Sequence, residues 1–432
     1  MKDRVRLIAL LILPLLLCGV STRVLAQDKQ HPPEGFESIF NGKDLEGWYG
    51  GETRDPVFAK GWGEPQWSGY RNNLHRQVTK HWRVDNGELI GTGAGPDLVC
   101  WGQYSDFELQ LEWKVAPNSE SGISLRHQPG IKLWDAGSEA LRGRGADKGS
   151  GGLTQNKTQG QSPAERADKP AGQWNRMIVR TVGPLVTVIL NDKKVLDNTA
   201  IDNAYDANHP IDARGAIHLQ THSGEVRFRN IAIRELSSDE SNDVLAEAAG
   251  DDKDYTPLFN GKDFTGWIGA TNSYEIIEDG IRCKRLGGGK MVTQKQYKDF
   301  IVRMQIKLCP GGNNGLAIRA PGPGGGVMEL QVLDDPHEMF AKLRPDQYHG
   351  SAYGIKPAHR GYLRPTGQWN HQEVYVKGDH VRVLLNGYEI LNVKLKEAAP
   401  NNGAAMRTQG HFGFISHADP VAFRHVRIKE LK

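Results

Sequence analysis

A run of residues that occurs twice is the feature that most constrains the fold of this chain. It reads Phe-Asn-Gly-Lys-Asp-Leu-Glu-Gly-Trp at residues 40–48 and Phe-Asn-Gly-Lys-Asp-Phe-Thr-Gly-Trp at residues 259–267. Such a repeat marks the starts of two related units and must be interpreted before any other pattern. Asn-Gly favours a tight turn because both residues tolerate positive φ, and the flanking aromatic rings predict burial on either side of that turn. We therefore expect two copies of one β-rich domain.

Later matches define the boundaries of the two units. Tyr-Ser-Asp-Phe at 104–107 recurs as Tyr-Lys-Asp-Phe at 297–300, and Gly-Gln-Trp-Asn at 172–175 recurs at 367–370. The opening run recurs at a longer spacing than these motifs, so the first unit carries an insertion at about residues 50–81. We interpret it as a loop elaboration over a site. The predicted domains span residues 36–236 and 255–432, each large enough for a core of its own.

The first residues of the chain have the pattern of a signal peptide. Lys2, Arg4 and Arg6 precede an apolar run at 7–20, and Val-Leu-Ala at 24–26 offers a cleavage site of small residues. The apolar run is too short for a membrane-spanning helix. Residues 1–26 are therefore expected to direct export to the periplasm or the extracellular space, and the mature chain is not expected to span a membrane.

Composition argues against one class of partner and predicts the kind of segment that connects the two domains. The net charge is +3, with acidic and basic residues interspersed, so no basic run predicts a nucleic-acid partner. Residues 237–254 are rich in Ser, Asp and Glu and are predicted to form an acidic linker that buries nothing. Three cysteines follow the leader, and a disulfide between Cys283 and Cys309 is one pairing that the sequence allows.

Alternation of apolar and polar residues predicts strands throughout, with no convincing helix in the first unit. Residues 107–115 alternate strictly, which is typical of a half-buried antiparallel strand. The closing strands at 226–236 and 421–431 each change phase, which predicts a bulge near Asn230 and near His425. Many short strands with Gly and Pro turns favour an all-β fold of two tandem jelly-roll sandwiches.

The same alternation predicts which side chains leave the core of the first unit. Ile217 and Leu219 face inward, so the residues between and beyond them face outward. An exposed Trp beside planar donors suits a sugar ring and its hydroxyl groups, so carbohydrate is the predicted ligand. His218 and His222 are also candidate ligands of a divalent metal ion, although no cofactor is required by the pattern. The predicted site residues of this face are Arg126, Lys132, Trp134, His218, Gln220 and His222, with Asp135 at a strand end.

The second unit presents a related but different set. Glu329 is the carboxylate placed in the middle of the predicted face, and His349 is a candidate contact on a neighbouring loop. Gly413 and Ile415 occupy the positions of His218 and Gln220, so the two faces are not expected to be equivalent. The outward set of this unit is Arg319, Glu329, Gln331 and His417, with Asp334 at the strand end.

These motifs resemble one family. Besides the opening run, the chain contains Ser-Gly-Ile-Ser-Leu-Arg at 121–126, Leu-Trp-Asp at 133–135, Gly-Ser-Gly-Gly-Leu at 149–153 and Gly-Gln-Trp-Asn-Arg at 172–176. Together they are similar to the 3-keto-disaccharide hydrolase family, whose members are also described as 3-keto-glucoside 1,2-lyases and 3-keto-2-hydroxyglucal hydratases. The resemblance covers both units and implies a concanavalin-like jelly roll in an exported bacterial protein.

The implied reaction needs a base and a positive group. A ketone at C3 acidifies the hydrogen on C2, a base removes that proton, and the enolate expels the group on C1. In the first unit we expect His222 or Asp135 as the base and Arg126 or Lys132 as the electrophile. In the second unit we expect Glu329 as the base. Arg319 and His417 are expected beside the ketone.

The competing hypothesis is a glycan-binding, lectin-like surface protein. Jelly rolls serve as binding modules as readily as they serve as enzymes, and the predicted faces fit either role.

Overall fold

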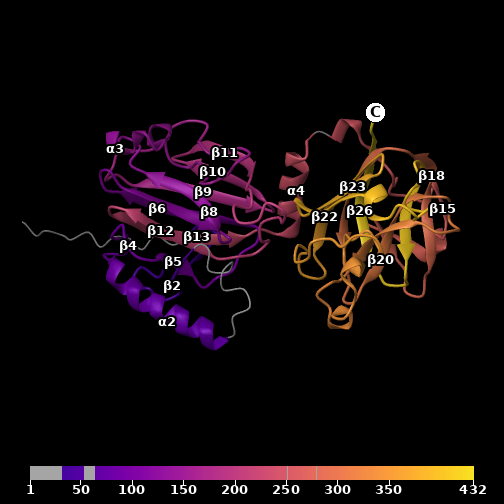
Figure 1. The fold of residues 1–432 in the computed structure, drawn as a ribbon, viewed down its shortest axis with the longest axis horizontal. Helices are drawn as coiled ribbons and strands as arrows, with labels where there is room; N and C mark the ends of the chain where they lie inside the picture. Colours follow the sequence, from indigo (N-terminus) through magenta and orange to yellow (C-terminus); the bar gives the residue numbers. More distant parts are fainter. Residues whose placement is uncertain (1–31, 53–63, 251, 279) are drawn as a thin grey trace, which may run out of the picture. The chain divides into compact units, whose positions relative to one another are not determined.

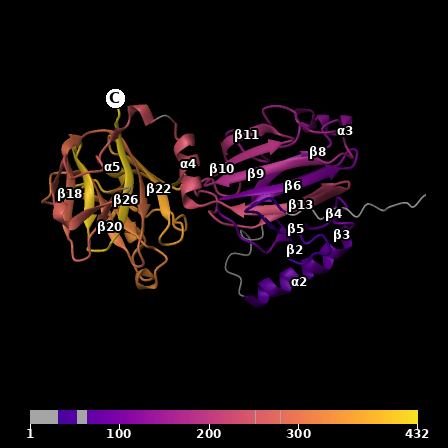
Figure 2. The ribbon, with the colours of Figure 1, turned by 180° about the vertical axis from the view of Figure 1, so that it is seen from behind.

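Each half of the described chain forms a sandwich of two antiparallel sheets (Figure 1). The computed structural model describes residues 32–52, 64–250, 252–278 and 280–432. The predicted signal peptide therefore lies outside the described residues. The fold confirms the predicted all-β class, with two tandem jelly-roll sandwiches. The view from behind shows the strands of both halves (Figure 2).

The first sandwich contains an eight-stranded and a five-stranded sheet among the described residues. The larger sheet has the order β11 (Lys193–Ala200), β10 (Leu185–Leu190), β9 (Asn175–Val182), β6 (Phe107–Val115), β13 (Val226–Glu235), β4 (Glu88–Gly91) and β3 (Trp82–Asp85), and β1 (Glu37–Ser38) pairs with β13. The smaller sheet has the order β2 (Trp48–Gly51), β5 (Asp97–Cys100), β12 (Ile217–Ser223), β7 (Glu120–Leu125) and β8 (Gln128–Trp134).

The second sandwich repeats this plan over its described residues. Its larger sheet has the order β16 (Tyr274–Ile277), β17 (Gly280–Cys283), β26 (Ala422–Glu430), β19 (Phe300–Lys307), β22 (Trp369–Lys377), β23 (His380–Leu385) and β24 (Tyr388–Lys394), and β14 (Thr256–Pro257) pairs with β26. Its smaller sheet has the order β15 (Trp267–Gly269), β18 (Gly289–Tyr297), β25 (Gly410–Ser416), β20 (Asn313–Ala320) and β21 (Met328–Leu333).

The period-two pattern places the core as predicted. In β6 every odd-numbered residue from Phe107 to Val115 is buried and every even-numbered one is partly exposed. The two predicted bulges are confirmed, because Asn230 and His425 both have positive φ and the strand register shifts beside each. The core of each sandwich therefore lies between its two sheets. The alternate side chains of each strand lie on the outer faces of the sheets.

The repeated opening run forms the same turn in both sandwiches. The Asn41 side chain accepts hydrogen bonds from the backbone N–H groups of Lys43 and Asp44, and the Trp48 indole donates to the Ile39 carbonyl. The second copy makes the same contacts through Asn260 and Trp267. The run thus fixes a rim turn and buries one indole ring beneath it.

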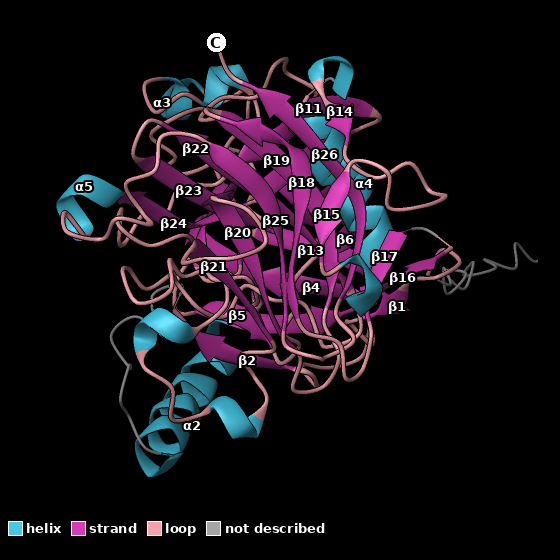
Figure 3. Ribbon diagram, turned by 90° about the vertical axis from the view of Figure 1, so that its right-hand side faces the viewer, coloured by secondary structure: helices cyan, strands magenta, loops and turns pink. Residues whose placement is uncertain are grey.

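The insertion in the first unit is a helix over its described residues, which corrects the prediction of a loop. Helix α2 (Glu64–His81) lies beside β2 at the edge of the sandwich (Figure 3). Gly50 allows this approach, because a Cβ at that position would lie 2.5 Å from the Leu74 carbonyl oxygen. Val78 is fully buried in the core. Residues 53–63 of the insertion lie outside the described residues.

The predicted acidic linker also forms a helix, and it does bury side chains. Helix α4 (Ser238–Ala248) starts with a capping box in which Ser237 and Glu240 satisfy each other's backbone N–H groups. Val244 and Leu245 pack against Val182 of β9, and the Asn242 amide donates to the Trp369 carbonyl. Composition alone missed this because the apolar residues are few and lie on one face.

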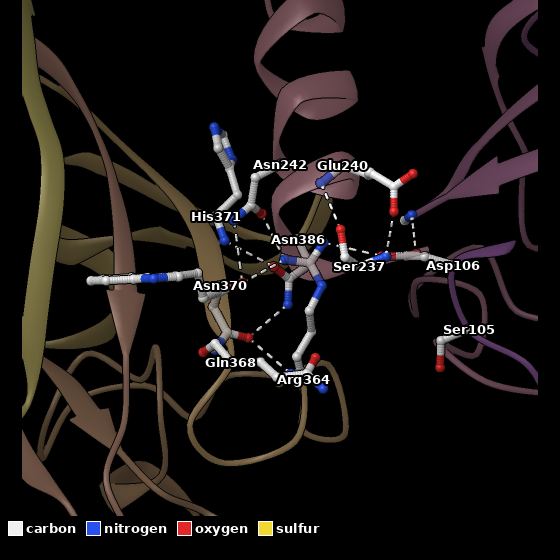
Figure 4. Close-up of polar contacts among 12 residues, drawn as sticks. Ser105, Asp106, Ser237, Glu240, Asn242, Arg364, Gln368, Asn370, His371 and Asn386 are labelled. Carbon is white, nitrogen blue, oxygen red and sulfur yellow. Dashed lines mark hydrogen bonds and ion pairs between the residues drawn. The ribbon is translucent and has the colours of Figure 1, made fainter. Parts of the chain in front are cut away.

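Buried polar contacts join α4 and the two sandwiches. Arg364 donates to the Asn242 side chain at 2.6 Å and forms an ion pair with Asp106 at 3.0 Å (Figure 4). Within the second sandwich, the Asn386 amide donates to the Asn370 side chain and to the Tyr362 carbonyl.

The remaining helices of the described residues are short. They are α3 (Glu139–Arg142), α5 (Leu395–Ala398) and the 3-10 turns η1 (Ala146–Lys148), η2 (Asp252–Asp254), η3 (Thr271–Ser273), η4 (Glu338–Phe340) and η5 (Pro345–Gln347). Within the described ranges, no helix is long and apolar enough to cross a membrane. Cys283 and Cys309 are free thiols, so the candidate disulfide is not formed.

Candidate functional site

The outer face of the smaller sheet carries the polar residues of the first sandwich. In the central strand β12, Ile217 and Leu219 are buried in the core, as predicted. His218, Gln220 and His222 alternate with them and point to the opposite face. His222 is exposed, whereas Gln220 and His218 are buried.

A polar cluster surrounds His222. Its Nε2 lies 3.3 Å from the Gln220 Oε1, and Glu120 on β7 pairs in register with Ser223. The Glu120 carboxylate forms an ion pair with the Arg144 guanidinium at 2.8 Å. Partial burial lowers the pKa of His222, Glu120 opposes that shift, and Arg144 reinforces it. Because Nε2 donates to Gln220, the Nδ1 atom of a neutral His222 is the basic nitrogen.

Lys132 and Trp134 flank this cluster, but the Trp is not exposed as predicted. The Trp134 ring is 7% exposed, packs with Leu141 and Ala146, and donates from Nε1 to the Gly149 carbonyl. The glycine-rich loop, residues 143–152, covers it. Lys132 keeps partial exposure, with its Nζ donating to the Gln161 carbonyl, and burial lowers its pKa.

Two of the predicted residues lie away from the cluster and hold the backbone. Arg126 is fully buried and donates to the Tyr388 hydroxyl and the Gly183 carbonyl. The alternation prediction was wrong there because β7 ends at Leu125 and positive φ at Arg126 turns the chain off the sheet. Asp135 accepts backbone N–H groups through both carboxylate oxygens, so it stabilises a turn.

His218 makes a histidine pair in place of an open face. Its Nε2 lies 3.1 Å from the Nδ1 of His127, whose own Nε2 accepts the Ala216 N–H. His127 therefore donates to His218. Burial lowers the pKa of His127 to about 4 and that of His218 to about 3, so both rings are neutral near pH 7. Among the described residues, no group of three or more His, Cys, Asp or Glu side chains is arranged to hold a metal ion.

The second sandwich brings Glu329 and His417 together. The Glu329 Oε1 lies 3.9 Å from the His417 Nε2, and this carboxylate raises the pKa of His417. Glu329 lies over Gly315, where a Cβ would come within 2.0 Å of its Oε1. Gln331 is buried beside them and donates to the Asn313 side chain. His417 directly follows β25, and His222 is the penultimate residue of β12. The repeat aligns the two positions, so both faces carry a histidine at the equivalent place.

The other three predicted residues of the second unit are structural in their contacts. Arg319 is buried and donates to three backbone carbonyls besides pairing with Asp299. Asp334 accepts from the Gly311 N–H and the Thr366 hydroxyl. His349 is buried, accepts from the Leu333 N–H and donates to Gln372, so it is not a loop contact at the surface.

Two residues of the first cluster were missed by the sequence analysis. Glu120 has the same parity on β7 as Gly122 and Ser124, so strand alternation could have found it. Arg144 lies between α3 and η1 in the glycine-rich loop. No alternation pattern there predicts which way a side chain points. Its position depends on how that loop folds over the sheet.

Both halves of the chain are similar to one family of known proteins. The family model of the 3-keto-alpha-glucoside-1,2-lyase-like domain matches residues 35–234 and 254–429. A 3-keto-disaccharide hydrolase of Bacteroides thetaiotaomicron is 28% identical over 227 residues, which cover 41% of this chain and 78% of that protein.

Solved structures match over a stretch the size of one sandwich. A protein assigned provisionally as a glycosyl hydrolase from Parabacteroides distasonis is 25% identical, with a TM-score of 0.38, over 43% of this chain and 97% of that one. A carbohydrate binding module of Bacillus subtilis is 13% identical, with a TM-score of 0.29, over 38% and 96%. The two family matches span most of the sequence, and this chain therefore belongs to the 3-keto-alpha-glucoside-1,2-lyase-like domain family, in two tandem copies.

Proposed function

We propose that this protein is an exported carbohydrate-active enzyme that cleaves 3-keto-glycosides, and that the His222 face performs the cleavage. The observation that carries the proposal is the convergence of His222, Gln220, Glu120 and Arg144 on one outer face. This cluster brings together a nitrogen base, a cation and planar hydrogen-bonding groups. Removal of a proton beside a ketone requires such a base and such a cation.

His222 takes the proton in this mechanism. Gln220 holds its Nε2, so Nδ1 is free to remove the hydrogen on C2 of the substrate. A lowered pKa keeps the ring neutral, and therefore basic, at the pH where most histidines begin to protonate. Glu120 fixes the Arg144 guanidinium beside the ring through their ion pair.

A cation then stabilises the charge that develops on the ketone oxygen. Arg144 is the first candidate because its side chain is partly exposed beside the cluster, and Lys132 is the second. The enolate re-forms its C=O bond, the C1–C2 double bond forms, and the C1–O bond breaks. The leaving alcohol receives a proton from the His222 imidazolium, so the base is restored. Addition of water across the new double bond would give the free 3-keto sugar and complete a net hydrolysis.

The test uses the two equivalent histidines as a matched pair. His222→Gln and His417→Gln are compared with the wild-type chain on a 3-keto disaccharide, and the enone product is followed by its ultraviolet absorbance. We expect His222→Gln to lower kcat by about a hundredfold or more, which is typical for loss of a general base, with little change in thermal stability. His417→Gln should retain most of the rate of enone formation. Equal rates in His222→Gln and the wild type would refute the assignment, and a wild-type chain without turnover would refute the proposed function.

A further inference from the structure

A cleft in the first sandwich is lined by aromatic rings, uncharged polar groups and the Glu46 carboxylate. Its volume is about 730 Å³, and it lies between the β2 edge of the smaller sheet and helix α2. Figure 3 shows this helix beside β2. Over the part of the chain that the structure describes, its lining consists of Leu45, Glu46, Gly47, Trp48, Tyr49, Ser68, Asn72, Thr79 and Trp101.

Trp101 and Tyr49 form the aromatic wall. Their ring centroids lie 4.6 Å apart with planes inclined by 38°, and the Trp101 side chain is 53% exposed. The backbone N–H of Trp101 donates to the Gly47 carbonyl, and this hydrogen bond fixes the backbone beneath the ring. Tyr49 pairs with Val99, and Val99 pairs with His218, so this wall borders the same sheet face as the His222 cluster.

The opposite wall and the charge of the lining define the ligand class. Helix α2 supplies two hydroxyl groups and an amide from Ser68, Thr79 and Asn72. Among the described lining residues, Glu46 carries the one charge and none is Lys, Arg or His, so these residues offer an anionic ligand no counter-charge. Flat rings facing uncharged hydrogen-bonding groups suit the apolar faces and hydroxyl groups of a neutral sugar.

The Trp101 end of the cleft is too far from His222 to hold the same sugar ring. Trp101 is level with Ala216 in the strand register, because Val99 is level with His218. Six residues separate Ala216 from His222 along the strand direction, a distance of roughly 20 Å. A ligand that occupies both places must be a chain of several sugar units.

In the second sandwich, other residue types stand at the two positions of this wall. Ile268 occupies the position of Tyr49, and Gln294 occupies that of Trp101, where it donates the equivalent backbone hydrogen bond to Gly266. The helix that forms the other wall belongs to the insertion in the first unit. The cleft is therefore a feature of one repeat, not of the shared fold.

We propose that the cleft of Trp101, Tyr49 and helix α2 binds a neutral oligosaccharide and anchors the distal units of a glycan that reaches the His222 face. The assignment of that glycan as a glucoside chain rests on the proposed function. The binding itself requires only the aromatic wall and the polar helix.

The experiment measures binding by isothermal titration calorimetry with cello- and malto-oligosaccharides of two to six glucose units, and with polygalacturonate as an acidic chain. Trp101→Ala is compared with its matched control, Gln294→Ala, and with the conservative Trp101→Phe. We expect Trp101→Ala to weaken the binding of the longer oligosaccharides by about tenfold or more, as for loss of a buried aromatic contact. Gln294→Ala should bind as the wild type does, Trp101→Phe should retain most of the affinity, and polygalacturonate should not bind.

Two outcomes would overturn the inference: wild-type affinity in Trp101→Ala, or the absence of oligosaccharide binding in the wild-type chain. Turnover of a 3-keto disaccharide by the wild-type chain is measured alongside. Its absence, together with a loss of binding in Trp101→Ala, would remove the proposed function and leave the glycan-binding cleft in place.

Discussion

The Arg319 guanidinium lies 2.9 Å from the Asp299 carboxylate, whereas their counterparts in the first sandwich, Arg126 and Asp106, bind groups of the second sandwich. Both arginines also donate to a turn carbonyl at the same position, Gly183 in the first unit and Gly378 in the second. In the second sandwich this Arg and Asp therefore bind each other, whereas in the first sandwich each binds a residue of the second sandwich. This explains why both copies keep an Arg at a position that alternation assigned to the outer face.

The Asp106–Arg364 ion pair should contribute to the stability of the whole described chain. Both side chains are almost buried, so removal of either one leaves a charge without its partner. We expect Arg364→Met or Asp106→Asn to lower the free energy of unfolding by about 3 kcal/mol, and the double variant to lose less than the sum. Chemical denaturation measures both. Arg382→Met, which breaks an exposed pair with Glu389, is the control and should cost less than about 1 kcal/mol.

Arg126→Met should destabilise the protein without impairing the chemistry. The substitution leaves the Gly183 carbonyl and the Tyr388 hydroxyl without their donor in a buried place. The expected loss in the free energy of unfolding is about 3 kcal/mol. Turnover per folded molecule, measured well below the unfolding temperature, should stay near the wild-type value. A well-folded variant with no turnover would restore Arg126 as a catalytic group.

The two charges beside His222 should move the acid limb of the pH–rate profile in opposite directions. The basic form of His222 is the active one, so the rate falls as pH drops through its pKa, which lies below the usual value for histidine. Arg144 lowers that pKa, so Arg144→Met should move the limb to higher pH. Glu120 raises it, so Glu120→Gln should move the limb to lower pH. Shifts of the same sign in both variants would contradict this account.

His218 should make the protein less stable in acid. Its pKa falls to about 3 on folding, so its contribution is complete above the unfolded value of about 6.5 and is lost as pH falls toward 3. The unfolded chain then binds the extra proton. The free energy of unfolding should decrease by up to about 1.4 kcal/mol per pH unit from this group. His218→Gln should flatten the slope between pH 6 and 4, as followed by denaturation at each pH.

Glu329 should control the protonation of His417. The carboxylate raises the pKa of this histidine above its ordinary value through their contact. Glu329→Gln removes the charge and keeps the shape, so the pKa of His417 should fall. Titration of the His417 ring protons by nuclear magnetic resonance checks this directly, with His222 as the internal comparison. An unchanged titration of His417 would show that the two side chains do not interact in solution.

Strand alternation predicted the layers, and it failed wherever a strand ended. It placed Ile217, Leu219 and the residues of β6 correctly because side chains in an extended backbone must alternate between faces. It misplaced Arg126 one residue beyond β7, since positive φ there takes the chain off the sheet. It also left Trp134 exposed, because a period along one strand says nothing about the loop that covers it.

The sequence by itself determined the repeat, the rim turns, the bulges and the direction of each strand's core face, because these depend on neighbouring residues and on the geometry of an extended backbone. Only the tertiary structure decided that Arg144 pairs with Glu120 beside His222, that α4 buries its apolar face, and that Trp101 faces helix α2. Those contacts join segments far apart in the chain. Their geometry depends on how loops of variable length close, which no local pattern encodes.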